Sequence, residues 1–159
     1  MRYALFRRPQ YSRFGGLIMA ENITFHFDVD GENFSSAGEA SVLVKKKLRQ
    51  LGFSPEIIRR VSIAMYEGEI NMVIHANGGD ADVTVTDEDI IIVLADKGPG
   101  IPDVNLAMQE GFSTARDNIR ALGFGAGMGL PNMKKYTDTM KIDTELGVGT
   151  TITMTVRHK

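Results

Sequence analysis

Residues 54–77 read SPEIIRRVSIAMYEGEINMVIHAN and carry the pattern of a long helix. Ser54 followed by Pro55 is typical of a helix N-cap and first turn, because the serine oxygen can accept a hydrogen bond from a free backbone N–H. Apolar residues then recur at helical spacing, which predicts a helix to about Ala76 with one buried stripe. The predicted stripe comprises Ile57, Val61, Ala64, Met65, Gly68 and Met72.

Strand and helix patterns occur in blocks on both sides of this helix. Alternating residues predict a strand at 22–29, and a helix is expected at 33–51 with Ser35 and Ser36 near its start. Later elements are expected as an antiparallel strand pair at 81–86 and 90–95, a helix at 128–138, and strands at 139–145 and 150–157. Because strands and helices occur in blocks and do not alternate strictly, the pattern favours an α+β fold, a two-layer α/β sandwich.

Composition narrows the class of protein. The chain has 159 residues, 43% of them hydrophobic and 24% charged, which suits one domain with its own core. The formal net charge of −2 argues against a direct nucleic-acid or membrane-surface role, since both need a basic field. No apolar run approaches the roughly 20 residues of a membrane span. The absence of cysteine excludes disulfides and thiolate metal sites and fits a cytoplasmic location.

The first 18 residues differ in composition from the rest. They carry Arg2, Arg7, Arg8 and Arg13 with no acidic residue, and they lack the apolar core of a signal peptide. We expect residues 1–18 to be a poorly ordered leader, or an artefact of start-site choice, ahead of a domain at 19–159. The alternative is a basic arm that touches a partner.

Three polar residues form a row on the central helix. Glu67 and Asn71 are four residues apart, so their side chains share one face, and His75 continues the row. The row flanks the buried stripe and can face a cleft. A carboxylate there can deprotonate a nucleophile, and an amide oxygen can ligate Mg²⁺. Ordinary polar residues at a helix boundary would give the same pattern.

A second polar group follows the strand expected at 90–95. Asp96 stands at its end, with Gly98 and Gly100 in the loop beyond. The acid can accept a hydrogen bond from an exocyclic amine such as that of adenine, and glycines let the backbone approach the base closely. A plain exit from strand to loop is the alternative.

Glycines alternate at Gly125, Gly127 and Gly129, directly before the helix expected at 128–138. Open backbone N–H groups and the positive end of the helix dipole together suit a phosphate. The spacing is neither a Walker A loop nor a dinucleotide-binding fingerprint. A flexible linker would have a similar composition.

The last hairpin carries Gly147, Gly149, Thr150 and Thr151 around its turn. A hydroxyl here can reach a phosphate or steady the glycine segment, whereas a simple β-turn before a β-branched strand is the alternative. Each of these signals is weak singly, but their order along the chain is distinctive.

The ordered set resembles the N-box and glycine boxes of the GHKL ATPase superfamily over about residues 22–157. It consists of E-x-x-x-N on a helix, D-x-G-x-G after a strand, a glycine-rich segment running into a helix, and a G-x-G-T hairpin. The resemblance implies the Bergerat fold, with a mixed, mainly antiparallel sheet, helices on one face and a flexible lid over ATP. It implies ATP and Mg²⁺ as cofactors, Glu67 as catalytic base and Asn71 as metal ligand. The other ATP-binding positions it implies are Asp96, Gly98, Gly100, Gly125, Gly127, Gly129 and Thr150.

Within the superfamily, the segments 62–75 and 127–134 look like those of stand-alone anti-sigma-factor serine/threonine kinases. Gyrase-, Hsp90- and MutL-like ATPases need further domains. A complete histidine kinase needs a phosphoacceptor histidine on a helix, and residues 1–60 contain only His26, on a predicted strand.

The resemblance therefore implies phosphorylation of a serine or threonine on a small STAS-type partner, an anti-anti-sigma factor. A homodimer is compatible with it. Two alternatives stay open: a non-catalytic, ATP-switched binding module for a sigma factor or other regulator, and an isolated histidine-kinase-like ATPase domain.

The expected lid, 105–129, is polar and contains glycine, so we expect it to move without ligand. It holds Arg116 and Arg120, either of which can reach a γ-phosphate as charge develops. Two solvated arginines on a mobile segment are the alternative.

Overall fold

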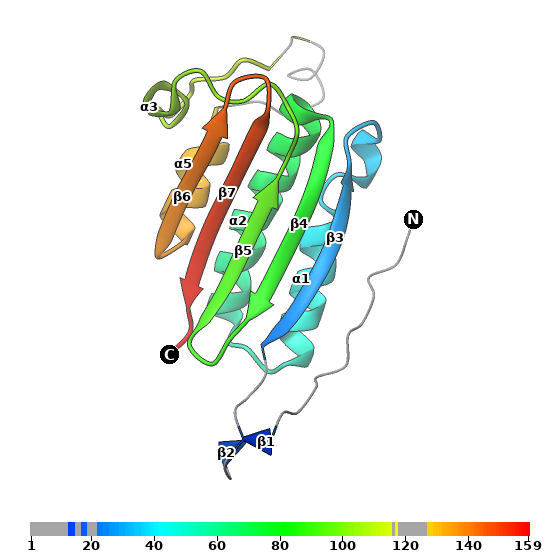
Figure 1. The fold of residues 1–159 in the computed structure, drawn as a ribbon, viewed down its shortest axis with the longest axis vertical. Helices are drawn as coiled ribbons and strands as arrows, with labels where there is room; N and C mark the ends of the chain where they lie inside the picture. Colours follow the sequence, from blue (N-terminus) through cyan, green and yellow to red (C-terminus); the bar gives the residue numbers. More distant parts are fainter. Residues whose placement is uncertain (1–12, 15–16, 19–21, 116, 118–126) are drawn as a thin grey trace.

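The computed structural model describes residues 13–14, 17–18, 22–115, 117 and 127–159. Within them, helices cover one face of a five-stranded sheet (Figure 1). The expected α+β two-layer sandwich is confirmed.

The five strands of the main sheet lie in the order β3-β4-β5-β7-β6. Their bounds are Ile23–Asp30 for β3, Gly78–Val85 for β4, Asp89–Ala95 for β5, Thr139–Glu145 for β6 and Gly149–Arg157 for β7. All four pairings are antiparallel, which narrows the expected mixed, mainly antiparallel sheet to an antiparallel one among the described strands. The β4–β5 and β6–β7 neighbours need only hairpin connections for this pairing.

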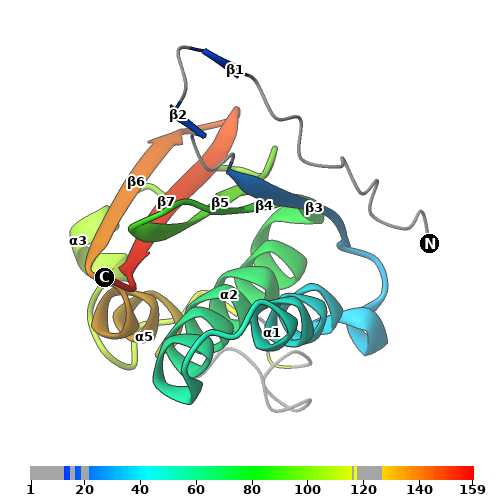
Figure 2. The same ribbon diagram turned by 90° about the horizontal axis from the view of Figure 1, so that it is seen from below.

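Three helices pack on the same face of this sheet, as the view in Figure 2 shows. They are α1 (Glu39–Gln50), α2 (Pro55–Ala76) and α5 (Gly129–Tyr136). A short 3-10 turn, η1 (Phe34–Ser36), precedes α1, and the one-turn helix α3 (Val104–Ala107) follows the loop after β5. Helix α2 lies between α1 and α5 and contacts both.

Helix α2 begins and ends as the sequence predicts. The Ser54 hydroxyl oxygen accepts a hydrogen bond from the Ile57 N–H at 3.3 Å, and the left-handed residue Asn77 (φ 55°) ends the helix. The predicted stripe is buried at Val61, Ala64, Met65, Gly68 and Met72 and half-buried at Ile57. A β-carbon on Gly68 would stand 2.0 Å from Leu94 Cδ1, so a larger residue here would require the Leu94 side chain to move.

The core fills the space between the sheet and the helices. Val83, Ile92 and Met154 are cross-strand neighbours on β4, β5 and β7, and each is 0% exposed. Their inward direction follows from the alternation of side chains along each strand. This layer brings the last residues of β5 and the first residues of β7 opposite the C-terminal half of α2.

Two element starts were predicted wrongly. Helix α1 begins at Glu39 and not near 33, because Asn33 caps η1 instead and Gly38 takes a left-handed backbone (φ 97°). Strand β4 begins at Gly78 and not at 81. A β-carbon on Gly78 would stand 2.1 Å from Val29 O, so glycine lets the chain leave α2 and pair with β3 at once.

Helix α1 is capped by a residue of α2. The Glu69 carboxylate accepts hydrogen bonds from the backbone N–H groups of Gly38, Ala40 and Ser41 at 2.9, 3.1 and 3.1 Å. A carboxylate at this end of α1 also complements its dipole. Glu69 is 2% exposed, and its burial raises the pKa of the carboxyl above its ordinary value while the three amide donors oppose that rise. This contact fixes the rotation of α2, and hence the direction of its other face.

The chain before β3 is described only at two short strands. β1 (Arg13–Phe14) pairs with β2 (Leu17–Ile18), with Arg13 opposite Ile18. The other residues of the expected leader at 1–18 lie outside the described residues, so its order stays a prediction.

Candidate functional site

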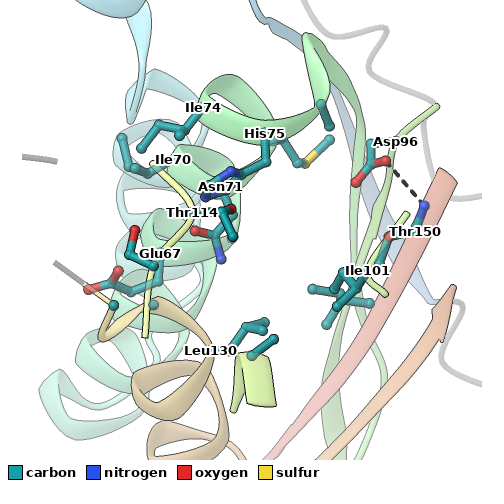
Figure 3. Close-up of a pocket in the computed structure, with 18 of the residues that line it drawn as sticks. Glu67, Ile70, Asn71, Ile74, His75, Asp96, Ile101, Thr114, Leu130 and Thr150 are labelled. Carbon is teal, nitrogen blue, oxygen red and sulfur yellow. Dashed lines mark hydrogen bonds between the residues drawn. The ribbon is translucent and has the colours of Figure 1, made fainter. Parts of the chain in front are cut away.

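One cleft, with a volume of about 470 Å³, lies between α2 and the ends of β5 and β7. Glu67, Asn71 and His75 line it from α2, so the predicted row does face a cleft (Figure 3). Asp96 and Thr150 line the opposite wall. Small-molecule sites are typically clefts of about 300–1,000 Å³, so this one is large enough for a nucleotide-sized ligand.

Glu67 contacts helix α5 at the edge of the cleft. Its Oε1 accepts a hydrogen bond from the side-chain Nδ2 of Asn132 at 3.2 Å, and both side chains are half-buried. No ion pair of Glu67 occurs among the described residues. Asn132 was not predicted from the sequence as a site residue. A signal was present, since it stands three residues after Gly129 and thus on the same side of a helix.

Asn71 lies against the first residue of α5. A β-carbon on Gly129 would stand 3.1 Å from both Nδ2 and Oδ1 of Asn71, so the missing side chain lets α5 approach the amide. Mg²⁺ usually keeps several waters and binds through one or two protein oxygens plus substrate phosphates. A single amide oxygen beside an open cleft fits that requirement.

The N-terminus of α5 opens onto the same cleft. Gly127, Gly129 and Leu130 line it, and no side chain caps the helix. Gly127 has φ 77°, and its carbonyl accepts a hydrogen bond from the Gly111 N–H at 2.9 Å. Free amides at a helix N-terminus favour an anion. The arrangement supports a phosphate site at Gly127 and Gly129, whereas Gly125 lies outside the described residues.

Asp96 uses one carboxylate oxygen to hold the loop after β5. Its Oδ1 accepts hydrogen bonds from the backbone N–H groups of Gly98 at 2.8 Å and Thr150 at 3.1 Å, the second drawn in Figure 3. Its Oδ2 accepts none from the described residues. Since Asp96 lines the cleft, that second oxygen is available to an amine such as that of adenine.

The Thr150 hydroxyl is engaged within the protein. Thr150 is 6% exposed, and its Oγ1 lies 2.8 Å from the Oγ1 of Thr144. Thr144 in turn accepts a hydrogen bond from the Ile101 N–H at 2.8 Å. These contacts tie the hydroxyl to Thr144 and, through it, to the loop after β5, so its expected role towards a phosphate or the glycine segment stays a prediction.

Gly98 and Gly100 lie close to atoms of neighbouring elements of the fold. A β-carbon on Gly98 would stand 2.6 Å from Ala76 Cβ, and one on Gly100 (φ 78°) would stand 2.6 Å from Glu145 O. Gly100 lines the cleft, but Gly98 is not among the residues that line it. These contacts explain both glycines by close packing of the loop on α2 and on the β6–β7 hairpin.

The charge of the described cleft wall is dominated by acids. His75 keeps part of its side chain in solvent, yet desolvation lowers its pKa, so it is neutral near pH 7. The expected cations of the lid, Arg116 and Arg120, lie outside the described residues. Neutralisation of a bound polyphosphate therefore falls, in the described part of the site, to backbone amides and to any metal held at Asn71.

Sheet, helices and cleft together define a two-layer α/β sandwich with a cleft of nucleotide size. The profile of the histidine kinase-, DNA gyrase B- and HSP90-like ATPases matches residues 44–159. The chain therefore belongs to this ATPase family, which confirms the resemblance drawn from the sequence.

Shorter relatives match over most of their length. The serine/threonine-protein kinase RsbT of Bacillus subtilis (strain 168) is 32% identical over 117 residues, covering 71% of this chain and 82% of the relative. An anti-sigma F factor of Bacillus licheniformis is 33% identical over 140 residues, covering 84% of this chain and 89% of the relative.

A solved structure shares the fold. The RsbU and RsbW domains of a Mycobacterium tuberculosis protein align with a TM-score of 0.59 at 18% identity, over 84% of this chain and 32% of that longer chain.

None of the helices in the described part of the chain is both long and apolar enough to cross a membrane.

Proposed function

We propose that this protein is an ATP-dependent serine/threonine kinase of the anti-sigma type, which transfers the γ-phosphoryl group to a hydroxyl of a small partner protein. The observation that carries the proposal is the cleft itself. It has Glu67 and Asn71 a turn apart on one wall and Asp96 on the other. A base, a metal ligand and an amine acceptor thus face a single space.

Each polar group has a separate task. Asp96 Oδ2 accepts from the adenine amine, while Oδ1 holds the Gly98 and Thr150 amides. The N-terminal amides of α5, at Gly127 and Gly129, face the phosphates. Fixed dipoles of this kind stabilise charge as it develops during transfer.

Asn71 is the residue that would hold Mg²⁺ through its Oδ1. When bound, the metal would neutralise charge on the phosphate oxygens. Gly129 keeps the Asn71 amide at the cleft surface, because no side chain intervenes between them.

The transfer step balances as follows. The partner's hydroxyl oxygen forms a bond to the γ-phosphorus, and the bond from that phosphorus to the β–γ bridging oxygen breaks. ADP leaves with the electron pair of that bond, and the hydroxyl proton passes to the Glu67 carboxylate. Because phosphoryl transfer depends mostly on positioning and electrostatics, the protein's main contribution is to hold these groups in line.

The kind of partner is proposed from the relatives. One is named a serine/threonine-protein kinase and others anti-sigma F factors. A small STAS-type protein, the anti-anti-sigma factor, is the proposed phosphate acceptor, and a sigma factor is the proposed second partner. The protein would act in the cytoplasm, where such partners are found.

The test is transfer of γ-labelled phosphate to STAS-type proteins encoded beside this gene, with Mg-ATP. Label on a serine or threonine of one of them supports the kinase. The competing function is ATP-switched binding of a partner without phosphoryl transfer. No label on any candidate, together with different affinity for one of them in ATP and in ADP, would establish that function instead.

A further inference from the structure

We infer that Asn132 is the positioning residue of the base: its side-chain amide fixes Oε1 of Glu67 and leaves Oε2 as the atom that takes the proton. The inference rests on the proposed function for its catalytic consequence. Its geometric part, the Asn132–Glu67 pairing, stands on contacts alone.

The pairing is a long-range one. Asn132 Nδ2 donates to Glu67 Oε1 at 3.2 Å from another helix, 65 residues away in sequence. No other described residue donates a side-chain hydrogen bond to the Glu67 carboxylate. Without the bond from Asn132, a glutamate side chain with three rotatable bonds would point to several places along the cleft edge.

The same turn of α5 also positions Asn71. Gly129 lies against the Asn71 amide, and Asn132, three residues later, bonds Glu67, four residues earlier on α2. Residues spaced by one turn on α5 therefore pair with residues spaced by one turn on α2. The helix whose N-terminus faces the phosphates is the helix that orients the base, so phosphate and base positions are coupled by one rigid element.

The chemistry of the donor matters. An amide is neutral, so it orients the carboxylate without the strong stabilisation of its charge that a lysine or arginine would give. A carboxylate at this position would repel Glu67. Lys134 and Lys135 of α5 are exposed, and neither forms an ion pair with Glu67. Oε2 of Glu67 thus has no hydrogen-bond partner among the described residues.

The first measurement needs no transfer. In ¹H–¹⁵N spectra, the side-chain NH₂ resonance of Asn132, assigned by its loss in Asn132→Ala, should shift in Glu67→Ala. It should not shift in Glu56→Ala, which removes an exposed carboxylate in the first turn of the same helix. An Asn132 resonance that is the same in all three proteins would overturn the pairing.

The second measurement is single-turnover phosphoryl transfer from Mg-ATP to the acceptor that the γ-label test identifies. Asn132→Ala should slow transfer by about tenfold or more, the usual weight of a hydrogen bond to a charged group, with unchanged ATP affinity. Asn132→Gln, which keeps the amide donor, should recover part of the rate. The control Lys134→Ala removes an exposed side chain of α5 and should transfer like the wild type.

A double-mutant cycle completes the test. In a Glu67→Gln background, Asn132→Ala should have little further effect, because a residue that acts through the base has nothing left to position. Full additivity, or wild-type transfer by folded Asn132→Ala and Asn132→Gln alike, would overturn the positioning role. If the resonance shifts as expected but the wild type transfers nothing, the pairing is correct and the proposed kinase function is wrong.

Discussion

The α-carbon of Gly129 lies against the side chain of Asn71, so that a β-carbon at position 129 would stand 3.1 Å from both Nδ2 and Oδ1. This distance is shorter than ordinary carbon contacts. Gly129→Ala should therefore displace the Asn71 amide by a few tenths of an ångström.

We predict that Gly129→Ala weakens Mg-ATP binding on the order of tenfold, with little change in unfolding free energy because alanine favours the helix. Titration calorimetry of ATP binding, with Mg²⁺ and with EDTA, measures the loss of affinity. The loss should occur only with Mg²⁺ present. An equal loss under both conditions would mean that the substitution blocks the nucleotide itself and not the metal ligand.

Asp96 gives a second prediction. In Asp96→Asn the amide oxygen can still accept from the Gly98 and Thr150 N–H groups, but an NH₂ group replaces Oδ2. Two donors would then face each other across the adenine contact, and ATP affinity should fall by about tenfold or more. Asp103→Asn, the same change at another cleft-lining residue, is the control. Equal ATP affinity of Asp96→Asn and wild type in calorimetry would remove the adenine assignment.

Glu69 and Glu67 stand two residues apart on α2 but differ in task. Glu69→Ala would leave the buried N–H groups of Gly38, Ala40 and Ser41 without their acceptor, and should lower the unfolding free energy by at least about 2 kcal/mol. Glu67→Ala removes one hydrogen bond at the cleft edge and should cost about 1 kcal/mol or less. Urea denaturation of both variants measures this difference. Equal losses would mean that Glu69 is not the main cap of α1.

A pH dependence is expected on the outer face of the sheet. The Asp82 carboxylate accepts a hydrogen bond from His26 Nδ1 at 2.7 Å, and this contact raises the pKa of His26 above 6.5. A raised histidine pKa means that this stabilisation is full below pH 6.5 and is lost as pH rises through the folded-state value. The His26 side chain is 51% exposed, so the effect should be at most about 1 kcal/mol.

The measurement is the difference in unfolding free energy between wild type and Asp82→Asn, from pH 5.5 to 8.5. The comparison cancels groups that the two proteins share, including His75, whose pKa is lowered. The difference should shrink as pH rises. A difference that is constant over this range would show that the His26–Asp82 pair does not titrate in this way.

The sequence predicts elements whose signals are local. Helix α2 carries its own cap at Ser54 and its own apolar stripe, so its bounds and its cleft-facing row could be predicted. The start of α1 could not, because it depends on Glu69, some thirty residues later, and on the backbone of Gly38.

The same distinction between local signals and contacts made on packing applies to the candidate site. Spacing along one helix predicts that Glu67 and Asn71 share a face. Spacing also places Asn132 on the same side of α5 as Gly129, but its contact with Glu67 forms only after α5 has packed on α2 and could not be predicted. The contacts of Gly98 and Thr150 could likewise not be predicted from the sequence, since their neighbours, Ala76 and Thr144, belong to other elements.

Glu67 is the proposed base of phosphoryl transfer. Glu67→Gln keeps an oxygen that can accept from Asn132, so it should fold and bind Mg-ATP like the wild type. General-base contributions are about 100- to 10,000-fold, so single-turnover transfer to the acceptor should be at least about 100-fold slower in Glu67→Gln. Transfer by Glu67→Gln at the wild-type rate would exclude Glu67 as the base, because the proton would then have another acceptor.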